Sequence, residues 1–154
     1  MVKLILSAIL IIFPTMLSAD SLDKGYQAYK NKNYHEAYHH WMLGASQGDP
    51  ISEYNLALLY YFGNGVKKDL KLAFEYCEKS AKKGLPRAQN NLSHMYADGM
   101  GIKQSFMMSY KWAKIAIESG YSSHKILKNS KNKLNKSQLK IADQLIEKFL
   151  NEKN

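Results

Sequence analysis

The stretch that decides the fold is "ISEYNLALLYYFGNGVKKDLKLAFEYCEKSAKKG", residues 51–84, because the chain contains it twice. Shifted by 36 residues, it lies over "RAQNNLSHMYADGMGIKQSFMMSYKWAKIAIESG", residues 87–120. The identical pairs at this offset include Asn55/Asn91, Leu56/Leu92, Tyr60/Tyr96, Gly63/Gly99, Gly65/Gly101 and Gly84/Gly120. A self-similar segment at a fixed period is typical of a repeat protein.

Each copy contains two apolar stretches at helical spacing. In residues 51–84 they are marked by Leu56, Leu59 and Tyr60, and then by Ala73, Tyr76, Cys77 and Ala81. The G-x-G element between them is expected to end the first helix and turn the chain. The branched residue that follows, Val66 or Ile102, is expected to pack back into the core.

Helix stops and starts recur at the same period of 36 residues. Gly48, Gly84 and Gly120 read as stops, since glycine adopts the left-handed conformation after a last turn at little cost. The starts are residues 33, 69 and 105, which are asparagine, aspartate and serine, all good N-cap residues. The sequence therefore predicts an array of helix-turn-helix units.

The two ends of the array differ from its middle. The first unit is short, with a tight turn in place of the glycine loop and a second helix from Tyr34 to about Gln47. At the other end, Asn135 and Gln138 form a predicted capping box that begins an amphipathic helix. Such a helix covers the last core face of a solenoid. The predicted bounds are 1–19 signal peptide, 20–50 shortened repeat, 51–86 and 87–122 full repeats, and 123–154 capping helices.

These repeats resemble the Sel-one-like repeat, a relative of the tetratricopeptide repeat. Residues 51–84 keep the leucine, tyrosine, two glycines, valine, aspartate and final glycine of the family pattern, with Tyr76 in place of its tryptophan. Residues 87–120 keep Trp112 but depart from the pattern at Ile102, Ser105 and Ser109. The resemblance implies an all-α, right-handed α-solenoid of about three repeats, whose usual task is to bind other proteins.

The first nineteen residues have the order of a secretory signal peptide. Lys3 gives a positive start, Leu4 to Phe13 is free of charge, and "LSA" precedes Asp20. Cleavage after Ala19 would leave a periplasmic or secreted protein. The alternative is a retained membrane anchor, for which the apolar run is about half the length of ~20 residues that a spanning helix needs.

The charge of the mature chain bounds its partners. Without Lys3 there are 21 basic and 13 acidic residues, a net charge of +8. For an exported chain this favours an acidic protein or association with the anionic envelope or membrane surface, and not nucleic acid. Many of the lysines come late, at positions 125, 128, 131, 133, 136 and 140, where a solvated helix face is expected. We expect a monomer.

One short segment in the first repeat matches the zinc-binding motif of metalloproteases. "HEAYH", residues 35–39, matches H-E-x-x-H, but the extended pattern needs glycine and histidine where Met42 and Ala45 stand. The repeat frame instead makes Glu36 the third residue of a helix capped by Asn33, with its carboxylate reaching back to the cap amide. His35 and His39 then lie on an outer face, where adventitious metal binding stays an alternative. No metal site and no cofactor are predicted.

The single cysteine and the serines give no catalytic constellation. Cys77 has no intramolecular partner, so it is either buried, as its apolar helix suggests, or paired with another chain. S-x-x-K occurs five times in this lysine-rich chain, with neither of the partner motifs of a serine β-lactamase. The chain is not predicted to be an enzyme. A weak β-lactam hydrolase or a peptidoglycan-like ligand-binding protein is the alternative.

A binding groove is expected on the first helix of each repeat, on the face opposite its core leucine. In tetratricopeptide-like solenoids that helix lines the concave surface. The residues assigned to the groove are Tyr26, Tyr54, Leu58, Tyr61, Asn90 and His94, with Ala97 on the same face. Tyrosines suit an interface because they present area and a hydroxyl with little loss of entropy. The alternative for each ring is packing between neighbouring repeats.

Overall fold

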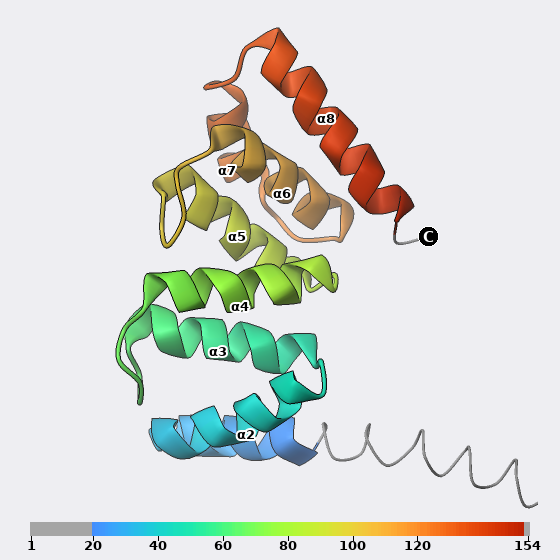
Figure 1. Cartoon of the computed structure of the whole chain (residues 1–154). Helices are drawn as coiled ribbons and strands as arrows, with labels where there is room; N and C mark the ends of the chain where they lie inside the picture. The colour runs from blue at the N-terminus through green and yellow to red at the C-terminus, as the bar shows by residue number, and fades with distance from the viewer. Residues whose placement is uncertain (1–19, 153–154) are drawn as a thin grey trace, which may run out of the picture. The chain divides into compact units, whose positions relative to one another are not determined.

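The computed structural model describes residues 20–152, which are helical throughout apart from their turns and contain no strand. This confirms the all-α prediction (Figure 1). The predicted signal peptide lies outside the described residues. The chain divides into two compact units at Asp69/Leu70, within the second repeat.

In the described part of the first unit, Trp41 of the second helix packs against the helix before it. Residues 20–30 are helical, and α2 (Tyr34–Ser46) and α3 (Pro50–Phe62) follow and contact each other. The Trp41 side chain is 2% exposed and lies 5.9 Å from the Tyr26 ring and 5.6 Å from the Tyr29 ring, between centroids. The predicted tight turn between the first two helices is present, with Lys32 at a φ of 59°.

The helix start at Asn33 is confirmed, but the role expected of Glu36 was wrong. The Asn33 Oδ1 accepts from the Glu36 backbone N–H at 3.5 Å. The Asn33 backbone N–H, however, donates to the Ala28 carbonyl at 2.9 Å, so it is not available to the Glu36 carboxylate. That carboxylate instead accepts from the Asn33 side-chain amide at 2.6 Å.

The second unit contains five helices within residues 70–152. They are α4 (Leu70–Lys82), α5 (Pro86–Asp98), α6 (Phe106–Glu118), α7 (His124–Lys131) and α8 (Lys136–Asn151). α6 is the central element, because it contacts α5, α7 and α8. Its buried face carries Trp112, Ile115 and Ala116, and the facing Leu92 of α5 is fully buried.

The turn between α5 and α6 has the predicted glycine geometry but not the predicted packing of its branched residue. Gly99 ends α5 at a φ of 71°, and Gly101 follows at 74°. Ile102 is 37% exposed, so the expectation that it packs into the core was wrong. Phe106, which the repeat pattern did not single out, is partly buried and packs against the cluster of Ala97, Ala113 and Ile126.

The capping helices are joined to the repeats by specific polar contacts. The Asn135/Gln138 capping box is present, with backbone-to-side-chain distances of 2.9 and 3.0 Å. The buried hydroxyls of Ser109 on α6 and Ser130 on α7 lie 2.7 Å apart. Lys114 Nζ of α6 lies 3.1 Å from the Asp143 Oδ1 of α8, which also accepts from the Tyr110 hydroxyl at 3.3 Å. α8 is therefore held against α6 by side chains as well as by its apolar stripe.

Candidate functional site

Four of the expected groove residues belong to the first unit. Three of them lie on the partly open face of α3, and the fourth, Tyr26, lies beside Trp41. Tyr54, Leu58 and Tyr61 are each half-buried on α3. The Tyr61 ring lies edge-on to Phe62, which is 59% exposed. These residues form an aromatic and aliphatic patch in contact with solvent.

Tyr26 contributes less to such a surface than the sequence suggested. It is 37% exposed, and its ring packs edge-on against Trp41 at an interplanar angle of 80°. Part of its area therefore belongs to the core of the first unit. For Tyr26, therefore, the alternative holds that the ring packs inside the fold and does not line a groove.

On α5, the three residues assigned to the groove have three different environments. His94 is exposed. Asn90 is half-buried, and its Oδ1 accepts from the Ser123 hydroxyl at 2.7 Å, which ties α5 to the residue before α7. Ala97 is 6% exposed in a cluster with Ala113 and Ile126, so its assignment to the groove was wrong. The physical reason is α7, which covers this part of α5.

The histidines of "HEAYH" do not form a closed metal site. His35 and His39 are exposed on α2, as predicted, with ring centroids 4.5 Å apart. Within residues 20–152, no group of three or more histidine, cysteine, aspartate or glutamate side chains could hold a metal ion. The fixed set of three protein ligands that a catalytic zinc needs is therefore not assembled in that part of the chain.

Cys77 is buried, as its helical environment predicted. Its side chain is 2% exposed, and its Sγ lies 3.3 Å from the Ala88 carbonyl oxygen. Burial, with a smaller contribution from Glu78, raises the pKa of the thiol to about 12. Because the thiolate is the reactive form, Cys77 is unsuited to nucleophilic chemistry near neutral pH.

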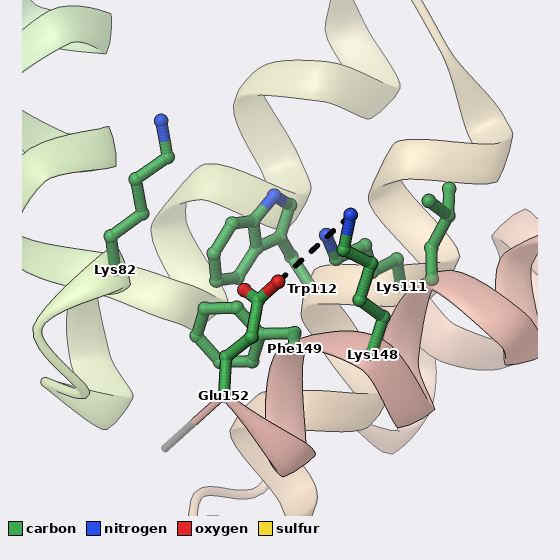
Figure 2. A pocket seen from close by; sticks show the side chains of 7 residues that line it. Lys82, Lys111, Trp112, Lys148, Phe149 and Glu152 are labelled. Carbon is green, nitrogen blue, oxygen red and sulfur yellow. Dashed lines mark ion pairs between the residues drawn. The ribbon is translucent and has the colours of Figure 1, made fainter.

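The structure also contains a pocket that sequence reasoning missed. It lies in the second unit, has a volume of about 500 Å³, and is lined by Lys82, Lys111, Trp112, Leu145, Lys148, Phe149 and Glu152 (Figure 2). These residues come from α4, α6 and α8, except Glu152, which directly follows α8. The Trp112 and Phe149 rings meet at 5.2 Å between centroids and an angle of 72°. The buried Trp112 Nε1 has no hydrogen-bond acceptor among residues 20–152.

Comparisons with known proteins agree with this architecture. The model of the Sel1 repeat matches the chain three times, at residues 19–49, 50–85 and 86–121. No curated protein matches the chain. Within residues 20–152, no helix combines the length and the apolar character needed to cross a bilayer.

Two solved structures are similar in fold. One is a protective antigen of uropathogenic Escherichia coli strains that displays an SLR fold, with a TM-score of 0.82 and 22% identity. That match covers 87% of this chain but only 30% of the antigen, so the chain spans less than a third of the antigen's length. The other is a Sel1 repeat protein from Oxalobacter formigenes, with a TM-score of 0.67, 25% identity, and coverage of 73% of this chain and 88% of that chain.

Proposed function

The chain belongs to the Sel1 repeat family, and on that premise we propose that it is an exported adaptor that binds a protein or peptide through the first helices of its repeats. Proteins of this family are in general adaptors for protein interaction, and the family is generally non-enzymatic. The observation that carries the proposal is the solvent-contacting patch of α3, formed by Tyr54, Leu58, Tyr61 and Phe62.

The chemistry of this patch suits a protein partner. Large side chains that combine apolar area with a polar tip contribute much of the energy at interfaces. The ammonium group of Lys68 lies 5.9 Å from the Tyr61 ring centroid, which places a positive charge beside the aromatic surface. A partner with apolar side chains next to carboxylates would complement this arrangement. His94, exposed on α5, supplies a hydrogen-bonding group on the corresponding helix of the next repeat.

Export is the second part of the proposal, and it rests on the charge and apolar pattern of residues 1–19. Amino-terminal sequencing of the protein from the cell envelope or the medium should begin at Asp20. A mature protein that still carries Met1 would overturn this part and leave the binding proposal untouched.

We expect the double substitution Leu58→Ala with His94→Ala to weaken capture of a protein partner from envelope extract about tenfold. His94 is exposed and Leu58 is half-buried, so the change removes interface area while costing about 1 to 2 kcal/mol of folding free energy. Asn90 is not chosen because its bond to Ser123 gives it a structural role. The measurement is quantitative pull-down beside a thermal melt.

A matched control makes this test specific. His39→Ala with Leu43→Ala changes the same residue types on α2, where both side chains are exposed. This variant should capture the partner as the parent does. Equal losses of capture in the two double variants, or no loss in either, would contradict binding through residues of α3 and of α5.

A further inference from the structure

The pocket between α4, α6 and α8 brings three lysines together over an apolar floor. Lys82, Lys111 and Lys148 each come from a different helix, and Trp112 and Phe149 lie between them (Figure 2). Its volume of about 500 Å³ falls within the range of roughly 300–1,000 Å³ typical of ligand pockets. This site is separate from the α3 patch, since it lies wholly in the second unit.

We propose that this pocket binds an acidic peptide segment of a protein partner, with one aromatic side chain on the Trp112–Phe149 floor and carboxylates at the lysines. The inference rests on the proposed role as a protein-binding module, and it names the chemistry that one part of the partner should have.

Lys111 is the pocket lysine whose ammonium group gains most from a bound carboxylate. Its ammonium lies 5.2 Å from the Trp112 ring centroid and 5.5 Å from that of Phe149, and it forms no ion pair with any described carboxylate. Burial lowers the pKa of Lys111, and the nearby charge of Lys82 lowers it further, while the carboxylates of Glu152 and Glu78 offset part of this. A bound carboxylate would relieve both effects, because it supplies the opposite charge that favours the ammonium form.

The other two lysines have only local partners. Lys82 pairs with Glu78 at 2.9 Å, and Lys148 lies 3.9 Å from Glu152, with both side chains of the second pair more than 60% exposed. Exposed pairs within one helical turn contribute little to stability. An incoming carboxylate can therefore replace Glu152 at Lys148 at small cost. Glu152, which lines the pocket, therefore competes only weakly with the peptide carboxylate for Lys148.

The shape of the pocket floor favours a single inserted side chain as the ligand, and not a flat membrane surface. Trp112 is 2% exposed, and Leu145 and Phe149 are half-buried, so the apolar groups are recessed behind the lysines. An anionic bilayer would reach the lysine ammoniums but not this floor. A single aromatic ring from a peptide can pack there against the half-buried Phe149 and Leu145.

The test uses the mature chain and a synthetic peptide in which one phenylalanine is flanked by two aspartates on each side. Calorimetry measures its dissociation constant, and tryptophan fluorescence reports its contact with the floor. We expect Lys111→Gln to weaken binding about tenfold, since a charge-assisted contact in a half-buried site is lost. Lys148→Gln, at an exposed position, should weaken it by about fivefold or less and serves if the first variant does not fold. Glu152→Gln should strengthen binding about twofold to fivefold.

Three controls separate the pocket from general charge attraction. Lys128→Gln on α7 and Glu147→Gln on α8 make the same charge changes at exposed positions outside the pocket and should leave the dissociation constant unchanged. A peptide with serine in place of phenylalanine should bind at least about fivefold more weakly, because the floor is then unused.

Several results would overturn the inference. They are equal effects of Lys111→Gln and Lys128→Gln, no peptide binding by the folded parent, and Lys111-dependent binding to phosphatidylglycerol vesicles that exceeds binding to the peptide. None of them bears on capture through Leu58 and His94, so the failure of this site and the failure of the proposed adaptor role remain distinguishable.

Discussion

Gly101→Ala should lower the free energy of unfolding of the second unit by about 3 to 5 kcal/mol. Gly101 has a φ of 74°, in the left-handed region, which costs a residue with a Cβ about 1–2 kcal/mol. A Cβ at this position would also collide with the backbone carbonyl of Leu70, whose carbon it would approach to 2.6 Å. Backbone cannot rotate aside as a flexible side chain can, so the chain must shift, at a further cost of about 2–3 kcal/mol.

Gly99→Ala is the matched control, two residues earlier in the same turn. Its φ of 71° is almost the same, but the nearest atoms to an added Cβ lie at 3.5 Å, an ordinary contact. We expect a cost of about 1–2 kcal/mol from the backbone conformation alone. Urea denaturation followed by circular dichroism measures both variants. Equal costs would show that the close approach of Gly101 to the start of α4 does not exist in solution.

Tyr96→Ala should be the second most damaging change, at about 3 to 4 kcal/mol. The Tyr96 side chain is 9% exposed and meets the Phe74 ring edge-on at 5.2 Å, so its removal leaves a cavity. Tyr60 occupies the same place in the preceding repeat but is only half-buried, with its hydroxyl donating to that of Tyr38 at 3.3 Å. We expect Tyr60→Ala to cost about 1 to 2 kcal/mol.

Chemical denaturation of the two alanine variants tests this difference. Tyr60→Phe, which removes only the hydroxyl, should cost about 0.5 to 1.5 kcal/mol and so divides the Tyr60 effect between ring and hydrogen bond. If Tyr60→Ala is as destabilising as Tyr96→Ala, then position in the repeat, rather than burial in the structure, sets the cost.

Features of this fold that depend on a few neighbouring residues could be predicted from the sequence. Asn33, Ser105 and Asn135 act as N-caps because the acceptor and the amide it serves are three residues apart. Gly48, Gly84 and Gly120 all have a positive φ. The repeat period placed Leu56 and Leu92 in the core, where both are fully buried.

Features that depend on the neighbouring helix could not be predicted in this way. The repeat alignment treats Tyr60 and Tyr96 as equivalent, although one is half-buried and the other buried. Ala97 was assigned to an open face because its own helix does not reveal that α7 covers it. Asp49 caps α3, because its carboxylate accepts from the backbone N–H groups of Ile51 and Ser52. Its position directly before Pro50 was a local signal for this cap. It was missed because it lies outside the 36-residue period that revealed the other caps.

The lysine pocket could not be predicted from the sequence for the same reason. Lys82, Lys111 and Lys148 lie far apart in sequence, each on a helix where a lysine normally faces solvent. Only the packing of α8 against α6 brings Lys148 and Phe149 to Trp112. A pattern based on spacing within one helix cannot detect a site built from three helices.

The central claim is that this chain binds a protein through the first helices of its repeats, and site-specific photocrosslinking in intact cells tests it most directly. A photoreactive amino acid replaces Leu58 on α3 or His94 on α5, and in control variants His39 on α2 or Glu75 on α4, both exposed. The account predicts one discrete crosslinked protein shared by positions 58 and 94 and absent from positions 39 and 75. Crosslinks of equal yield at all four positions, or at positions 39 and 75 alone, would contradict it.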